Sequence, residues 1–256
     1  MRHALLCLAL SAAATAQADI RSESLRWEVD GVAMQGHFVH DDAAPAKGGL
    51  VMVPNWMGVT DSALEKAKGI AARGYAVLLA DVYGADLRPA NAQEAGQAAQ
   101  SMYGQREVLR ARAGAAVDQL KARAGEAGFD AGSIGAIGFC FGGATVLELA
   151  RSGRDDIDGV VSFHGSLGTS LPAEAGAVKA SVLVLNGADD SYVSAEEISG
   201  LQKEMTEAGA DWQFVNFAGA VHCFAEADAN SPGCQYHERS AKRAYRMMDD
   251  FFAEVF

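Results

Sequence analysis

The sequence is short of positive charge. Its 256 residues include 21 Lys and Arg against 33 Asp and Glu, which gives a formal net charge of -12. Nucleic acid and anionic membrane surfaces are negatively charged and would repel so acidic a protein, so neither is expected as a partner. The sequence also contains no glycine-rich phosphate loop and no cluster of metal ligands, and we therefore expect no cofactor and no metal.

Repeats, linkers and long apolar runs are also missing. We find no repeat of domain size and no linker, and the whole chain contains five prolines. Half of the residues are hydrophobic, which is enough apolar material for one sizeable core. The apolar run at the N-terminus, residues 4–14, is too short to cross a bilayer as a helix. The composition therefore predicts one domain without a membrane span.

The N-terminus carries the three parts of a secretory signal peptide. Arg2 supplies the positive charge, residues 4–14 the apolar segment, and Ala16-Gln17-Ala18 the cleavage pattern of small residues. We predict that residues 1–18 are removed and that the mature domain covers residues 19–256. The protein is then expected to be exported, either to the periplasm or out of the cell.

Removal of the signal peptide leaves three cysteines, Cys140, Cys223 and Cys234. An oxidising compartment permits disulfides. Cys223 and Cys234 are eleven residues apart and flank a segment with Pro and Gly, so they are candidates for a bridge. Cys140 is then an odd thiol in an exported protein, and it requires an explanation.

Apolar strands alternate with helices along most of the chain. An Asp-Gly turn within residues 24–41 predicts an N-terminal hairpin, and the later strands are continuous Val, Ile and Leu runs. This order predicts an α/β fold, a single domain in which a mainly parallel sheet with an antiparallel N-terminal hairpin carries helices on both faces. Functional groups gather at the carboxyl ends of the strands in such sheets. The other expected strands are residues 49–54, 76–84, 133–140, 157–165, 180–187 and 212–219, and the expected helical segments are residues 63–74, 92–126, 143–153, 194–209 and 238–256.

Residues 138–142 read GFCFG and lie between a predicted strand and a predicted helix. A G-x-S-x-G sequence in that context forms a nucleophile elbow, a tight turn whose flanking positions have no room for a Cβ atom. The N-terminus of the following helix favours a thiolate. Cys140 is therefore a candidate nucleophile, and the N–H of Phe141 is a candidate oxyanion donor. The alternative is an inert, buried cysteine in a glycine-rich turn.

A cysteine nucleophile requires a histidine base and a carboxylate that orients it, and in this class of sheet they follow the nucleophile in the order acid, base. Asp189 and Asp190 follow one strand and His222 follows the next. His164 also follows a strand, but no strand end with a carboxylate lies between it and the nucleophile. We therefore expect His164 to be a hydrogen-bonded residue that lines the cleft.

The segments GFCFGG, NGADDSYVSAEE and AGAVHCF, together with PNWMG and ADVYG, resemble the motifs of the dienelactone hydrolase family of α/β-hydrolases. The resemblance covers essentially the whole mature chain. It implies an α/β-hydrolase fold with a triad of Cys140, Asp190 and His222, because Asp190 rather than Asp189 fits the spacing of the family motif. It also implies a second oxyanion donor at Trp56, whose side chain, like that of Met57, either lines an acyl pocket or packs the loop.

Two positions depart from the family pattern. Where the family has a glutamate that interacts with the resting thiol, this chain has Asn55, which cannot accept a proton. Where the family has an arginine that binds the substrate carboxylate, this chain has Glu226, which would repel a carboxylate at close range. We therefore expect a neutral ester or lactone as the substrate rather than a dienelactone. Tyr83 is a further candidate for the pocket, where it either supplies a hydroxyl or packs.

The predicted reaction is hydrolysis of a small-molecule ester or lactone through a thioester acyl-enzyme. An alternative from another class is a redox-active thiol or a non-catalytic binding protein on a hydrolase fold, because exposed thiols oxidise. A redox role would not require Asp190 and His222 at their motif positions, and no resolving cysteine is near Cys140 in the sequence. The sequence therefore favours the hydrolase.

Overall fold

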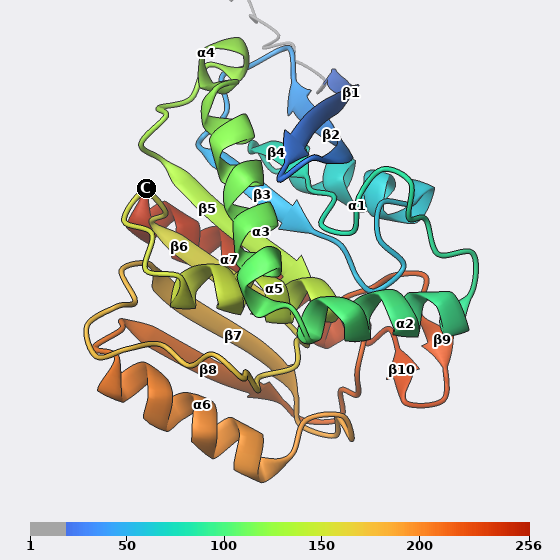
Figure 1. The fold of residues 1–256 in the computed structure, drawn as a ribbon, viewed down its shortest axis with the longest axis vertical. Coiled ribbons are helices and arrows are strands. Elements are labelled where there is room, and N and C mark those ends of the chain that lie inside the picture. The colour runs from blue at the N-terminus through green and yellow to red at the C-terminus, as the bar shows by residue number, and fades with distance from the viewer. Residues whose placement is uncertain (1–18) are drawn as a thin grey trace, which may run out of the picture.

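The apolar strands assemble into one large sheet in the computed structural model, which describes residues 19–256 (Figure 1). The predicted signal peptide, residues 1–18, lies outside the described residues. The strand order is β1-β2-β4-β3-β5-β6-β7-β8; β1, β2 and β4 pair antiparallel, and the strands from β4 to β8 in this order pair parallel. The bounds are β1 Ile20–Val29, β2 Val32–Asp41, β3 Gly49–Val53, β4 Ala76–Leu79, β5 Ile134–Phe139, β6 Gly159–Phe163, β7 Ser181–Gly187 and β8 Trp212–Phe217.

The N-terminal hairpin forms as the sequence predicts. Asp30 and Gly31 connect β1 to β2 and have positive φ values of 50° and 78°. A two-residue turn of this kind has the twist that matches the two flanking strands, which explains the Asp-Gly pair at this position.

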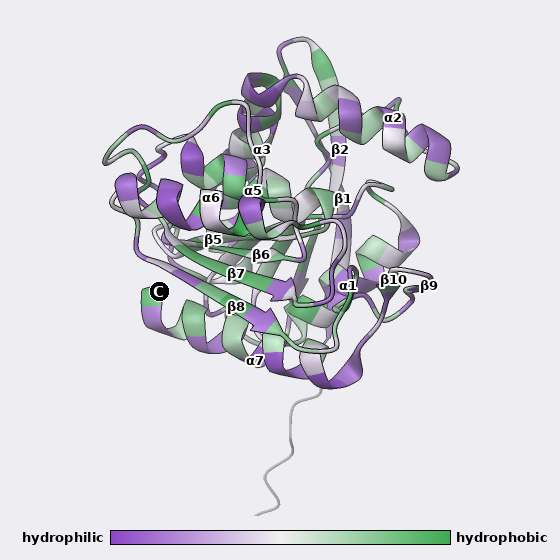
Figure 2. Ribbon diagram, turned by 90° about the horizontal axis from the view of Figure 1, so that it is seen from below, coloured by the Kyte–Doolittle hydropathy of each residue, from purple (hydrophilic) through white to green (hydrophobic). Residues whose placement is uncertain are grey.

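Helices cover both faces of the sheet. Figure 2 shows α3, α5 and α6 on one side of the strands and α1 and α7 on the other. No helix within residues 19–256 is long and apolar enough to cross a membrane. The helices are α1 Asp61–Ala71, α2 Ala92–Tyr103, α3 Arg106–Lys121, α4 Ala124–Ala127, α5 Phe141–Arg151, α6 Ala195–Glu207 and α7 Glu238–Val255.

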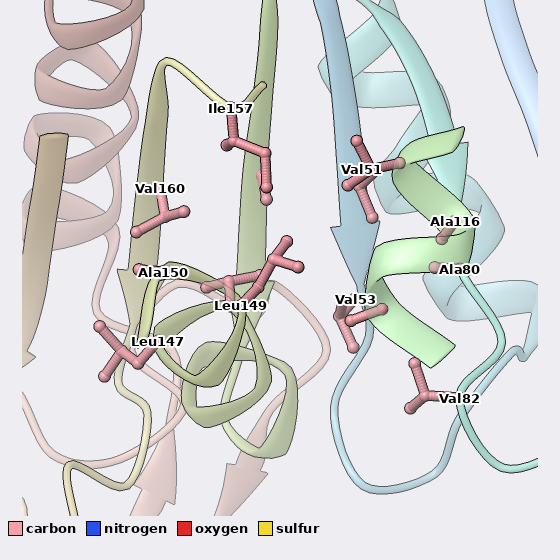
Figure 3. Packing of buried hydrophobic residues seen from close by; sticks show 14 of the residues in the cluster. Val51, Val53, Ala80, Val82, Ala116, Leu147, Leu149, Ala150, Ile157 and Val160 are labelled. Carbon is pink, nitrogen blue, oxygen red and sulfur yellow. The ribbon is translucent and has the colours of Figure 1, made fainter. Parts of the chain in front are cut away.

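The sheet separates two apolar cores. Along β3, Val51 and Val53 pack into the core beneath α3 and α5, while Leu50 and Met52 pack into the core on the α1 and α7 side. Figure 3 shows Val51 and Val53 among the side chains of the first of these cores. Because alternate side chains of a strand point to opposite faces, a strand that is buried on both sides reads as a continuous apolar run.

Three details differ from the sequence prediction. The helical segment 92–126 is divided into α2, α3 and α4, because the chain turns at Gly104 and again after Lys121. The strand predicted for residues 76–84 ends at Leu79, since the Asp81 carboxylate accepts the N–H groups of Tyr83 and Gly84 in a tight turn. A short hairpin of β9 Asn230–Ser231 and β10 Cys234–Gln235 was not predicted.

Candidate active site

Cys140 lies in the sharp turn between β5 and α5, with a φ of 53°. A Cβ atom on Gly138 would lie 2.0 Å from the carbonyl oxygen of Gly142, and a Cβ atom on Gly142 would lie 2.0 Å from the carbonyl oxygen of Val53. The two glycines of the motif are therefore required by the close approach of backbone to backbone. The Cys140 side chain is half-buried, and among residues 19–256 it is the only free cysteine.

Asp190 and His222 meet at the carboxyl ends of β7 and β8. Asp190 Oδ2 lies 2.7 Å from His222 Nδ1. The other carboxylate oxygen of Asp190 accepts the N–H of Tyr192, which fixes the orientation of the carboxylate. Asp190 is 5% exposed, whereas its neighbour Asp189 is exposed to solvent. Of the two aspartates that the sequence offers, it is Asp190 that contacts the histidine.

The electrostatic environment of His222 keeps its imidazole protonated. Burial acts to lower the pKa of His222, but the hydrogen bonds to Asp190 and Cys140 and the negative charges of these two groups outweigh it and raise the pKa to about 10. Because the folded-state pKa is above the ordinary value of 6.5, the stability that protonated His222 contributes is fully present below pH 6.5 and is lost as the pH rises through about 10.

We expect the imidazole of His222 to show no titration between about pH 5.5 and 7.5, where an unperturbed histidine changes its charge. The measurement is the pH dependence of the His222 ring resonances by NMR. In the Asp190→Asn variant the titration is expected to move to lower pH, because one hydrogen bond to an anion is lost. A midpoint near 6.5 in the wild type would contradict the assigned environment.

A cavity of about 360 Å³ opens over Cys140 and His222. Of the predicted pocket candidates, Trp56 lines it and Asn55, Met57, Tyr83, His164 and Glu226 do not. Four lining residues were not predicted, namely Tyr103, Ser166, Tyr192 and Val193. Tyr192 and Val193 follow Asp190 in the same turn, and Ser166 follows the end of β6, so their positions after strand ends could have predicted that they line the cavity. Tyr103 lies at the end of α2, and no sequence pattern marks it as a cavity residue.

Tyr83 and Asn55 act on the loop that follows β3 rather than on the cavity. The Tyr83 hydroxyl donates to the carbonyl oxygen of Trp56 at 2.9 Å, and the Asn55 side chain accepts the N–H of Met57 at 3.0 Å. Both bonds hold the peptide group that joins Trp56 to Met57. Of the two roles expected for Tyr83, the structure shows packing against this loop, and Asn55, a candidate for the pocket, does not line the cavity.

Glu226 is also turned away from the cavity. It is 3% exposed and forms an ion pair with Lys66 of α1, with Oε2 and Nζ 2.8 Å apart. The sequence expectation placed this carboxylate where it would repel a substrate. That placement is wrong, because the Lys66 ammonium neutralises the charge inside the protein.

His164 contacts the backbone of Cys140. Its ring is fully buried, and its Nδ1 accepts the N–H of Cys140 at 3.2 Å. Burial, together with the nearby charge of His222, holds the pKa of His164 well below its usual value. The histidine is therefore neutral and hydrogen-bonded, as expected, but it does not line the cleft.

A disulfide joins Cys223 to Cys234 beside His222. Cys223 directly follows His222, and the N–H of Gln235 donates to the His222 carbonyl oxygen at 3.0 Å. Both cysteines line the cavity. The bridge therefore ties the segment that carries the imidazole to the β9–β10 hairpin.

The double variant Cys223→Ala/Cys234→Ala is expected to lose about 3 kcal/mol of unfolding free energy, the amount associated with closing a loop of this length. We also expect lower turnover, since the support of His222 on one side is lost. Denaturant unfolding and ester turnover measure the two effects. Changing both cysteines avoids a single free thiol that would pair with Cys140. Unchanged unfolding and turnover would show that the bridge supports neither the fold nor the site.

The comparisons with known proteins agree with the fold. The model of the dienelactone hydrolase family matches residues 34–256. The solved structure m3DLH is 34% identical, with a TM-score of 0.85 and coverage of 93% of this chain and 99% of that chain. A dienelactone hydrolase-like promiscuous phosphotriesterase from metagenomic libraries is 34% identical, with a TM-score of 0.84 and coverage of 94% of this chain and 100% of that chain. A Caenorhabditis elegans protein of uncharacterised function is 31% identical over 134 residues, 50% of this chain and 83% of that protein.

The mostly parallel sheet, with its antiparallel N-terminal strands and with helices on both faces, is an α/β-hydrolase fold. Within that class, the chain belongs to the dienelactone hydrolase family. The protein is a hydrolase of esters or lactones, as the sequence predicts.

Proposed function

We propose that the protein hydrolyses a neutral ester or lactone with Cys140 as nucleophile, His222 as base and Asp190 as the group that orients the base. The observation that carries the proposal is the shared cavity. Cys140, held in its strained turn, and His222, bonded to Asp190, line the same cavity of about 360 Å³. A nucleophile, a base and an orienting carboxylate in this relation are the parts that covalent acyl transfer requires.

The reaction has two steps. The Cys140 sulfur attacks the carbonyl carbon of the ester while its proton resides on His222, and the oxyanion that forms accepts hydrogen bonds from the N–H groups of Phe141 and Trp56. The carbon–oxygen bond breaks, the alcohol leaves with the proton from His222, and a thioester remains on Cys140. Water, deprotonated by His222, then hydrolyses the thioester and restores the thiol.

The proposed preference for neutral substrates rests on the wall of the cavity. The nine described residues that line it include no Lys, Arg, Asp or Glu. The positive charge of His222 is already balanced by Asp190 and Cys140, so a carboxylate on the substrate would lose its hydration there without gaining a free cationic partner, which is unfavourable. Trp56, Tyr103 and Tyr192 supply aromatic surface for an apolar group instead.

The test is to trap the acyl-enzyme. Mature protein is mixed with a short-chain p-nitrophenyl ester, quenched during the burst, and analysed by intact mass and peptide mapping. We expect one acyl group on Cys140, no adduct in Cys140→Ala, and slower acylation by the same ester when its acyl chain ends in a carboxylate. An adduct that persists in Cys140→Ala would contradict the thiol mechanism. An untreated protein that carries a sulfenic acid or a mixed disulfide on Cys140 would favour the redox alternative.

Activated phosphotriesters are a second candidate substrate class. The observation in favour is that the metagenomic phosphotriesterase is 34% identical over nearly the whole of this chain. A triester is neutral, and its phosphoryl oxygen gains negative charge on attack, as a carbonyl oxygen does. Release of p-nitrophenol from a p-nitrophenyl dialkyl phosphate, lost in Cys140→Ala, would support this activity, whereas release that is indifferent to Cys140 would contradict it.

We further propose that residues 1–18 direct export and are removed. The disulfide between Cys223 and Cys234 supports this proposal, since such bonds persist in oxidising compartments. Cell fractionation and N-terminal sequencing test it. We expect protein outside the cytoplasm that begins at Asp19, and retention in the cytoplasm would contradict the proposal.

A further inference from the structure

Glu226 lies at the centre of a small buried network outside the cavity. Its Oε2 accepts a hydrogen bond from Asn55 Nδ2 at 2.6 Å and contacts Lys66 Nζ at 2.8 Å. The Lys66 ammonium also lies 4.3 Å from the centre of the Phe139 ring, at the end of β5. Glu226 Oε1 is buried and has no hydrogen-bond partner among the described residues. The orientation of this carboxylate therefore depends on Asn55 and Lys66.

The two polar atoms of the Asn55 side chain form hydrogen bonds with two different segments. Its Nδ2 donates to Glu226, and its Oδ1 accepts the N–H of Met57 at 3.0 Å. The Asn55 carbonyl oxygen also accepts the N–H of Gly58 at 2.9 Å. The two backbone bonds enclose Trp56, whose N–H belongs to the peptide that begins at the Asn55 carbonyl. The direction of the Trp56 N–H is thus set by how Asn55 is held.

We propose that Glu226 is a positioning residue that orients the oxyanion loop, residues 54–58, through the hydrogen bond that it accepts from the side chain of Asn55, while Lys66 balances its charge. This inference rests on the proposed function, because it assumes that the Trp56 N–H donates to the oxyanion. The network joins the segment that carries His222 to the segment that carries Trp56. These segments are distant in the sequence, since Asn55 and Glu226 are separated by 171 positions. Base and oxyanion donor are thereby held at a fixed relative position.

The energetics favour a role in geometry over a role in stability. Withdrawing a carboxylate and an ammonium from water is costly, and replacing a buried pair by apolar side chains of similar volume is often neutral for stability. An oxyanion donor, in contrast, is sensitive to its position, and loss of one donor lowers the rate by about 10²–10³-fold. A partial misalignment of the Trp56 N–H is expected to cost about 10-fold to 10²-fold.

Two matched double variants separate the hydrogen bond from the charge. Lys66→Met/Glu226→Gln removes both charges and leaves an amide oxygen that accepts from Asn55. Lys66→Met/Glu226→Leu removes the same charges and leaves no acceptor. We expect ester turnover to fall by about 10-fold to 10²-fold in the leucine variant and to stay close to wild type in the glutamine variant.

A second readout identifies the step that is affected. Alkylation of Cys140 by iodoacetamide requires the thiolate but forms no oxyanion, so its rate is expected to be unchanged in both variants. Equal turnover in the two variants, or a parallel fall in alkylation and turnover, would overturn the inference, because the network would then serve the nucleophile or the fold. Wild-type turnover that does not depend on Cys140 would instead show that the proposed function fails, and this inference with it.

Discussion

The Asp190→Asn variant is expected to turn over ester substrates about 10³-fold to 10⁴-fold more slowly than the wild type while keeping its fold. The carboxylate of Asp190 accepts a hydrogen bond from His222 Nδ1 at 2.7 Å and stabilises the positive charge of the ring. An asparagine amide supplies no negative charge, and when it presents its NH₂ group to Nδ1 it favours the wrong tautomer of the base. The loss is therefore expected mainly in kcat.

Asp189→Asn is the matched control for this measurement. It is the same chemical change one residue earlier, at an exposed side chain that forms no hydrogen bond or ion pair with the histidine, which is paired with Asp190. Its turnover is expected to equal that of the wild type. Steady-state kinetics with a p-nitrophenyl ester, together with thermal unfolding of both variants, provide the test. Similar turnover in the two variants would mean that Asp190 does not orient His222.

Gly142→Ala is expected to destabilise the protein by about 3 kcal/mol or more, and to remove activity where the variant still folds. The added Cβ would lie 2.0 Å from the carbonyl oxygen of Val53 and 2.5 Å from that of Pro54. Both contacts are with backbone, so no side chain can rotate away. Either α5 shifts from β3, which moves Cys140, or the loop that carries Trp56 is displaced.

Gly69→Ala provides the comparison. Gly69 lies in α1, is exposed, and would place a new Cβ in open space. Because alanine has the higher helix propensity, this variant is expected to gain about 0.5–1 kcal/mol. Urea unfolding of both variants against wild type measures the two effects. A Gly142→Ala variant as stable as the wild type would show that the elbow is less tightly packed than described.

The residues of the candidate site could be predicted from sequence wherever a functional group directly follows a strand. Cys140, Asp190 and His222 each lie just past the end of a parallel strand, and the sheet brings such ends to one edge. For the disulfide, the sequence identified Cys223 and Cys234 as the candidate pair but did not predict that the bond forms, because their spacing permits a bridge without requiring one.

What the sequence did not reveal depends on side-chain partners that are distant along the chain. Glu226 was expected to face the substrate because of its position after His222, yet it points to Lys66, which is 160 residues away on α1. Nothing in the local pattern of α1 marks Lys66 as the partner of a buried carboxylate. Tyr103, the last residue of α2, reaches the cavity next to the helix end at Gly104, whereas the sequence predicted one helical segment over residues 92–126.

The two outermost aromatic residues of the cavity, Trp56 and Tyr192, are 38% and 64% exposed. Their rings contribute little to the buried cores, which lie on the two faces of the sheet. Substitutions of these rings are therefore expected to change the shape of the cavity at little cost in stability. The residues that shape the rim of the cavity and the residues that form the cores are thus separate sets, so the rim can change while the scaffold stays constant.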